Sequence, residues 1–197
     1  MNINYNSINS IKNVLKNKNI APRKIWGQNY LINENIREKI IDALDIKKNE
    51  KIWEIGPGLG AMTATLLNKA NFLTAFEIDP KYSEILNEKF GQLKNFKLIE
   101  GDFLKTYKQE KTSINKIVSN LPYNIASKVI STLIEDEILT HMVFTVQKEL
   151  AERMIAKEGN KNYSSFTILV QSHFNVIKIM DIDKKIFIQS LKLNQQP

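Results

Sequence analysis

The feature that most constrains the fold of this 197-residue chain is an alternation of short apolar segments with longer amphipathic ones. The apolar runs predict β-strands at residues 51–55, 72–78, 96–102, 114–120, 142–147 and 176–182. Apolar residues at helical spacing predict helices at residues 7–18, 33–44, 61–70, 79–90, 126–134, 148–159 and 163–174. This alternation predicts an α/β fold, with a mostly parallel sheet and helices on both of its faces.

The strand at 51–55 runs into a glycine-rich turn, EIGPGLG at 54–60. Glycines at 56, 58 and 60 allow a tight turn and let a ligand approach the backbone. The next strand contains Glu77 near its end, and a carboxylate there can accept the hydroxyls of a ribose. Asp102 follows the third strand. Because ligands of parallel sheets bind at the carboxyl ends of the strands, this pattern predicts a site for a nucleoside-containing cofactor.

Two cofactor classes remain open on these residues, a dinucleotide and S-adenosylmethionine. A dinucleotide needs a helix N-terminus for its pyrophosphate, whereas S-adenosylmethionine carries positive charge. Glu54 stands two residues before the first glycine and suits a cationic ligand better. Asp102 suits the exocyclic amine of adenine. The alternative for Glu54 is an acid that caps a nearby helix.

Net charge and residue types restrict the partners. The formal net charge is +7 and the isoelectric point is about 9.4, which favours a polyanion such as nucleic acid, or else a lysine-rich solvated surface. The chain has no cysteine and two histidines, so we expect no disulfide, thiol catalysis or metal site. No run reaches the roughly 18 apolar residues of a membrane span. We expect a soluble, cytoplasmic protein; the oligomeric state is not readable.

The strand at 114–120 ends in an amide, and the chain then reads NLPY at 120–123. Asn and Pro are ordinary turn residues, so a capped helix start is one interpretation. Four segments together favour another: WGQNYL (26–31), EIGPGLG (54–60), NLPY (120–123) and VQKELAERM (146–154). They resemble the ribosomal RNA adenine dimethyltransferases of the KsgA type and their relatives, the Erm resistance methylases. The match covers about residues 21–187, and Gly27 before Gln28 is more like the KsgA branch.

The resemblance implies a Rossmann-like, S-adenosylmethionine-dependent methyltransferase fold. It places the cofactor contacts at Asn29, Leu31, Gly56, Glu77, Asp102 and Asn120. Of these, Asn29 and Leu31 rest on the resemblance alone, since from the residues they are a loop before a helix. In VQKELAERM, an alternative to an active-site role is a strand that runs into an amphipathic helix, with Glu149 and Arg153 as an i,i+4 pair.

The resemblance also implies how the target base is held. Adenine's exocyclic amine is a poor nucleophile, and we expect the Asn120 side chain and the Leu121 carbonyl to accept its hydrogens. Pro122 stiffens the turn. Tyr123 offers a face on which a flipped-out base can stack. Phe187 would stack on the other side of that base.

The chain departs from the family near its end. The family has a motif of the form F-x-P-x-P-K-V, whereas here Gln189 and Leu191 replace both prolines. We expect the family's C-terminal helical domain to be missing. We expect three parts: a basic N-terminal arm or helix at 1–24, a catalytic domain at 25–186 and an altered or truncated end at 187–197. Lys12, Lys16, Lys18, Arg23 and Lys24 make the N-terminal part a candidate phosphate-contacting arm, or else a frayed terminus.

The predicted activity is dimethylation of two adjacent adenines in small-subunit (16S) ribosomal RNA, with a role in ribosome biogenesis. The expected partner is the small ribosomal subunit, without a membrane or a metal. One alternative is an Erm-like methylase of large-subunit RNA. Another is a ribosome assembly or RNA-binding factor without turnover, which the altered 187–195 segment would fit. A nicotinamide-dependent oxidoreductase is a weaker hypothesis because it leaves NLPY unexplained.

Overall fold

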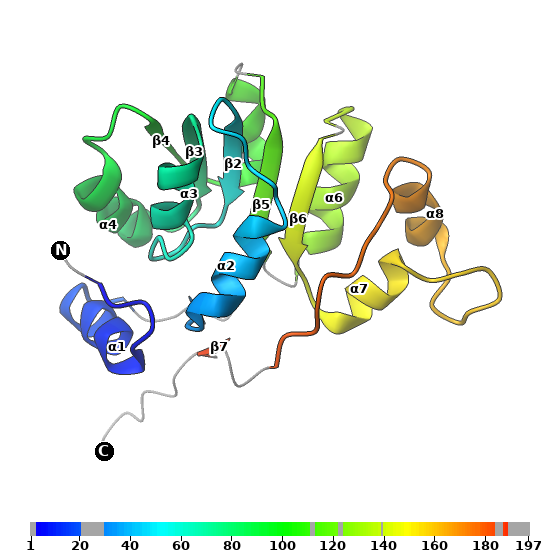
Figure 1. The fold of residues 1–197 in the computed structure, drawn as a ribbon, viewed down its shortest axis with the longest axis horizontal. Helices are drawn as coiled ribbons and strands as arrows, with labels where there is room; N and C mark the ends of the chain where they lie inside the picture. Colours follow the sequence, from blue (N-terminus) through cyan, green and yellow to red (C-terminus); the bar gives the residue numbers. More distant parts are fainter. Residues whose placement is uncertain are drawn as a thin grey trace.

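The computed structural model describes residues 3–20, 30–110, 113–121, 124–138 and 140–183, and the backbone of 187–188. Its centre is a five-stranded sheet in the order β4-β3-β2-β5-β6, in which every neighbouring pair is parallel (Figure 1). These strands are β2 (Lys51–Ile55), β3 (Phe72–Glu77), β4 (Phe96–Glu100), β5 (Lys116–Asn120) and β6 (His141–Thr145). The predicted parallel α/β sheet is therefore confirmed.

Helices connect the strands and cover the sheet. They are α1 (Ile8–Asn17), α2 (Glu34–Asp42), α3 (Thr63–Lys69), α4 (Pro80–Phe90), α5 (Phe103–Thr106), the 3-10 turn η2 (Tyr107–Gln109), α6 (Ala126–Glu135), α7 (Lys148–Met154) and α8 (Ser165–Gln171). Local signals explain several of their starts. Asn33 and Asp79 cap α2 and α4 with their side chains, and Pro80 occupies the first turn of α4.

Two apolar clusters lie on opposite faces of the sheet, because successive side chains of a strand point to opposite sides. Ile52 belongs to the cluster that α2, α3 and part of α4 cover, while its neighbour Trp53 belongs to the cluster under α5, α6 and α8. The same alternation places Ala75 in the first cluster and Phe76 in the second. Both faces are therefore buried, as near-continuous apolar strands require.

A third apolar cluster joins α1 to the sheet domain. Ile11, Val14 and Leu15 of α1 pack with Leu59 of the glycine-rich turn and with Tyr82 and Ile85 of α4. A frayed terminus is thus wrong for Ile8–Asn17, since the apolar side of this helix is buried.

The structure corrects the prediction of a strand at 176–182. These residues are not paired with a strand. Met180 and Ile182 pack against the first cluster, whereas Ile177 is 74% and Ile179 52% exposed. The apolar pattern was real, but a strand also requires a hydrogen-bonding neighbour, which no local pattern supplies.

Four short elements of the structure have no counterpart in the sequence predictions. Strand β1 (Tyr30–Leu31) pairs antiparallel with β7 (Phe187–Ile188), although more than 150 residues separate them. The helical turns α5 and η2 follow β4 in a segment that had no helical assignment. Among the described residues, no helix has the length and apolarity needed to cross a bilayer.

Candidate active site

The carboxyl ends of the parallel strands place several acids and amides along one edge of the sheet. Strand registers align Ile55 with Phe76 and Ser119, Glu77 with Glu100, and Asn120 with Thr145. Gly56, Asp102 and Leu121 come just after the ends of β2, β4 and β5. The fold therefore brings Gly56, Glu77, Asp102, Asn120 and Leu121 to the same edge, although they are far apart in sequence.

The glycine-rich turn after β2 adopts a conformation that favours glycine. Gly56, Gly58 and Gly60 have φ angles of 69°, 57° and 84°. Among the described residues, no heavy atom lies within 4 Å of a Cβ atom added at Gly56 or Gly58, so this part of the structure leaves open space on the outer side of the turn. At Gly60 an added Cβ would lie 2.8 Å from Phe90, which shows that this end of the turn packs closely on α4.

Glu77 connects the glycine-rich turn to the start of α4. One carboxylate oxygen accepts a hydrogen bond from the Gly58 N–H (2.9 Å), and the other accepts one from the Asp79 N–H (2.9 Å). The residue is only 4% exposed. Burial raises the pKa of Glu77 to about 7, against the lowering effect of these backbone hydrogen bonds.

Glu54 is completely buried beside the turn. Its Oε2 accepts a hydrogen bond from the Thr63 hydroxyl (2.7 Å), while its Oε1 has no hydrogen-bond partner within the described part of the chain. Burial, with a smaller contribution from the charge of Glu77, raises the pKa of Glu54 to about 8. Thr63 begins α3, but the group that donates to Glu54 is the Thr63 side-chain hydroxyl. A capping acid would instead accept from a backbone N–H in the first turn of the helix, so this bond does not make Glu54 a cap of α3.

The remaining polar positions of this edge have local roles as well. Asp102 caps α5, and its Oδ1 accepts a hydrogen bond from the Leu104 N–H (3.0 Å). Asn120 is half-buried at the end of β5. Leu121 is 1% exposed, and its N–H donates to the Thr145 carbonyl (3.1 Å), which holds the backbone just before the predicted Pro122 turn.

Several predicted site residues lie outside the described part of the chain, namely Asn29, Pro122 and Tyr123. Phe187 is described only as part of the backbone of β7. The pairing of β7 with β1 places its backbone next to Leu31, which is buried. Within α7, the ion pair joins Lys148 to Glu152 (3.8 Å), and Arg153 lies over the Phe166 ring, 5.3 Å from its centroid.

Comparison with known proteins identifies the family. The family model for ribosomal RNA adenine dimethylase matches residues 19–194. The chain belongs to the ribosomal RNA adenine dimethylase family. A "Ribosomal RNA small subunit methyltransferase A" from Borreliella burgdorferi is 74% identical over 98% of this chain, which spans 69% of that relative's length. A protein of the same name from Treponema denticola is 45% identical over 84% of this chain and is matched over 59% of its own length.

Solved structures give the same assignment. A dimethyladenosine transferase from Plasmodium falciparum superposes with a TM-score of 0.71 at 32% identity, covering 81% of this chain and 58% of the other. The 23S rRNA methyltransferase ErmE gives a TM-score of 0.59 at 25% identity, covering 70% of this chain and 55% of the other. The fold of this adenine dimethylase family member is thus the Rossmann-like fold of S-adenosylmethionine-dependent methyltransferases.

The residues of this edge fit the family's cofactor, S-adenosylmethionine. With respect to the described residues, the turn has open space where side chains at Gly56 and Gly58 would be, so a ligand can lie against its backbone. The buried Oε1 of Glu54 has no partner in the described residues and suits a cationic group, as the sequence suggested. Glu77 stands at the position of a ribose-binding acid, at the end of the strand next to the turn.

Three residues that sequence analysis did not select hold this edge together. The hydroxyl of Ser119 donates to the Ile55 carbonyl, which ties the end of β5 to the start of the turn. From outside the sheet, Tyr5 donates a hydrogen bond to the Leu59 carbonyl, and Arg37 donates one to the Leu31 carbonyl. The only signals in the sequence were an aromatic residue in a polar N-terminal segment and a charge beside the apolar positions of α2.

Proposed function

We propose that this chain transfers methyl groups from S-adenosylmethionine to the exocyclic amines of two adjacent adenines in small-subunit ribosomal RNA. The observation that carries the proposal is the position of Asn120. It ends β5, the strand that pairs with the glycine-turn strand β2. A base presented to Asn120 would therefore lie beside a cofactor held by Gly56 and Glu77. The same-named relatives in Borreliella burgdorferi and Treponema denticola support the small subunit as the target.

The chemistry needs hydrogen-bond acceptors and no strong base: as the N–CH3 bond forms, the S–CH3 bond would break and S-adenosylhomocysteine would leave, and the methylated amine would then release its proton to water. S-adenosylmethionine supplies an electrophilic methyl group on a sulfonium. The side-chain oxygen of Asn120 and the carbonyl of Leu121 would accept the two hydrogens of the target amine and orient its lone pair. Positive charge grows on the nitrogen during transfer, and neutral oxygen dipoles stabilise it without requiring an ionised group. The bond from the Leu121 N–H to the Thr145 carbonyl fixes the Asn120–Leu121 peptide, which anchors the chain immediately before the Leu121 carbonyl.

The base-stacking roles of Tyr123 and Phe187, and the stiffening role of Pro122, are part of this proposal. An aromatic face contributes about 1–3 kcal/mol per stacked base. The small ribosomal subunit is the proposed partner, and the cytoplasm is the proposed location. This chain spans 69% of the length of the Borreliella burgdorferi relative and 59% of that of the Treponema denticola relative, and the following assay tests its activity directly.

The decisive experiment measures transfer of labelled methyl groups to unmethylated small ribosomal subunits, with large-subunit RNA assayed alongside. Asn120→Ala should lower the rate at least about a hundredfold, because an amide that orients the reacting amine is removed. Asn49→Ala is the matched control, since Asn49 is exposed in the turn before β2 at the opposite edge. Circular dichroism and the thermal unfolding midpoint report whether each variant is folded.

The outcomes separate the alternatives. Label on adjacent small-subunit adenines, lost in Asn120→Ala and kept in Asn49→Ala, supports the proposal. Label only in large-subunit RNA would assign the chain to the Erm-like alternative. Cofactor binding without transfer to either subunit, together with unchanged subunit assembly in Asn120→Ala, would favour a factor without turnover.

A further inference from the structure

The N-terminal segment at residues 3–20 lies almost wholly before the region that the family model covers, yet it contacts the candidate active site. Its apolar residues Ile3, Ile11, Val14, Leu15 and Ile20 are at most 5% exposed. They share a cluster with Leu59, which is itself 2% exposed in the glycine-rich turn. The segment therefore packs directly on the turn, and its packing there has no part in the proposed chemistry.

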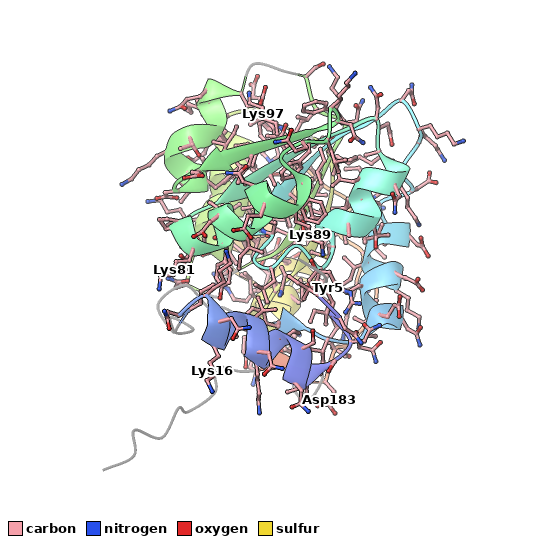
Figure 2. The ribbon with its side chains drawn as sticks, turned by 90° about the vertical axis from the view of Figure 1, so that its left-hand side faces the viewer. Tyr5, Lys16, Lys81, Lys89, Lys97 and Asp183 are labelled. Carbon is pink, nitrogen blue, oxygen red and sulfur yellow. The ribbon has the colours of Figure 1, made fainter. Side chains whose placement is uncertain are left out.

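Tyr5 makes the most specific of these contacts. Its hydroxyl donates a hydrogen bond to the Leu59 carbonyl (2.8 Å) and accepts one from Lys89 Nζ (2.7 Å). Lys89 also lies over the Tyr5 ring, 4.4 Å from its centroid, and Figure 2 shows the two side chains next to each other above α1. The hydroxyl lies 3.4 Å from the position of a Cβ at Gly60. Tyr5 thus connects α4 to the backbone of the turn.

Arg37 makes a second connection, between the N-terminal segment and β1. Its guanidinium donates to the Leu31 carbonyl (2.8 Å) and to Oδ1 of Asn6 (2.6 Å), and Arg37 is 6% exposed. Asn6 in turn donates to Glu34 (2.6 Å). Tyr5 therefore holds the backbone at Leu59 directly, and its neighbour Asn6 holds the backbone at Leu31 through Arg37.

A glycine-rich turn gains from such support. Glycine loses more conformational entropy on ordering than any other residue, so a turn with glycines at 56, 58 and 60 is costly to hold in one conformation. The apparent affinity of a ligand that needs the ordered turn is its intrinsic affinity multiplied by the fraction of time that the turn is ordered. Contacts that order the turn beforehand raise the affinity without touching the ligand.

We propose that residues 3–20 form a clamp that pre-orders the glycine-rich turn for cofactor binding, with Tyr5 as its positioning residue. The inference rests on the proposed function, because it assigns the turn to S-adenosylmethionine. Tyr5 itself does not contact the reacting atoms. It acts through the carbonyl of Leu59, so its removal changes cofactor affinity and leaves the transfer step at saturating cofactor unchanged.

The test compares Tyr5→Phe with Tyr163→Phe in the full chain. Both variants lose one hydroxyl and keep the ring, but Tyr163 is 37% exposed in the loop before α8. Calorimetry measures binding of S-adenosylmethionine well below the melting temperature, where both variants are folded. We expect affinity to fall about threefold to tenfold in Tyr5→Phe, the effect of one lost hydrogen bond, and to stay at the wild-type value in Tyr163→Phe.

A second measurement needs no ligand. Amide hydrogen exchange of a peptide covering residues 56–62 should be faster in ligand-free Tyr5→Phe than in Tyr163→Phe, since the clamp orders the turn before binding. Lys89→Met should give a smaller change in the same direction, because Tyr5 keeps its bond to Leu59. In transfer assays, KM for the cofactor should rise while kcat remains unchanged.

The outcomes distinguish the clamp from the proposed function. Unchanged affinity and unchanged exchange in Tyr5→Phe would overturn the clamp, even if the wild-type protein methylates RNA. Faster exchange with weaker binding supports it. If the wild-type protein binds no S-adenosylmethionine, the cofactor assignment and the role of the clamp in binding both fail, whatever the exchange rates show.

Discussion

Two acids on neighbouring strands, Glu54 and Glu77, show how burial and hydrogen bonding set the pKa of single carboxyl groups at the cofactor edge of the sheet. Glu77 receives two backbone N–H groups, whereas Glu54 receives only the Thr63 hydroxyl in the described structure. Fewer hydrogen bonds stabilise the charged form of Glu54, so its pKa is the higher of the two, about 8 against about 7. A cationic ligand beside Glu54 would reverse part of this shift.

Glu54→Gln should change how the stability of the ligand-free protein depends on pH. The pKa of Glu54 is about 8 in the folded protein and near 4.5 when unfolded, so the folded state binds more protons between these values. Stability from the protonated group is complete below pH 4.5 and is lost as pH rises towards 8. Wild-type protein should therefore lose about 1 kcal/mol per pH unit more than Glu54→Gln between pH 6 and 8.

Urea denaturation at pH 6, 7 and 8 measures this difference. Glu100→Gln is the control, because Glu100 is an exposed carboxylate at the end of β4, on the same edge. Its profile should run parallel to that of the wild-type protein. Parallel profiles for Glu54→Gln and wild type would mean that Glu54 is ionised throughout this range.

At the scale of elements, local patterns predicted the five strands of the sheet and the helices between them. Apolar runs and capping residues such as Asn33 and Asp79 act within a few residues, so they can be read in the sequence. Strand β1 could not be predicted in this way, because it exists only by pairing with β7. The segment at 176–182 failed for the opposite reason, since it has a strand pattern but no paired neighbour.

The candidate site shows the same division. Gly56, Glu77 and Asp102 could be selected because strand ends and glycine turns are local features that topology brings to one edge. Tyr5 and Arg37 could not, since their importance comes from contacts with the distant backbone of Leu59 and Leu31. Positions that act through tertiary contacts have no fixed spacing to a motif.

Lys116 at the start of β5 tests how buried polar contacts at the amino ends of the strands stabilise the fold. It is 7% exposed, and its Nζ donates to the Leu44 carbonyl (2.7 Å) and to the Asp45 carbonyl, and pairs with Glu50 (3.0 Å). Lys116→Met would leave these acceptors without their donor. The free energy of unfolding should fall by about 2–4 kcal/mol.

Chemical denaturation of Lys116→Met and Lys47→Met checks this prediction. Lys47 pairs with Asp45 on the same loop, but both side chains are more than 60% exposed, so its loss should cost at most about 1 kcal/mol. S-adenosylmethionine affinity should be unchanged in both variants, because the two lysines lie at the amino ends of the strands. Equal losses in the two variants would show that the buried contacts of Lys116 contribute no more to the free energy of unfolding than the exposed pair of Lys47.

At the scale of the whole molecule, the net charge of +7 is spread over a surface that includes one exposed face of α1. Ile11, Val14 and Leu15 bury one side of this helix, which leaves Lys12 and Lys16 exposed on the other. Figure 2 shows Lys16 pointing away from the body of the protein.

Lys18 instead pairs with Glu84 and Glu88 of α4 and so fastens the helix to the domain. The C-cap lysine of α1 thus anchors the helix, whereas Lys12 and Lys16 within it are exposed.

The exposed lysines of α1 should contact ribosomal RNA. Reversing them in Lys12→Glu/Lys16→Glu should weaken RNA binding about tenfold or more at low salt. It should also make log K less dependent on log salt, by about 0.7 for each phosphate that the variant no longer neutralises. Lys48→Glu/Lys94→Glu changes the net charge equally, but these exposed lysines precede the amino ends of β2 and β4, at the opposite edge.

Filter binding across a salt series compares the two pairs, with cofactor affinity as the folding control. If both pairs weaken binding equally, only the total charge attracts the RNA. If the α1 pair alone reduces the salt slope, the helix that clamps the glycine-rich turn also contacts the substrate.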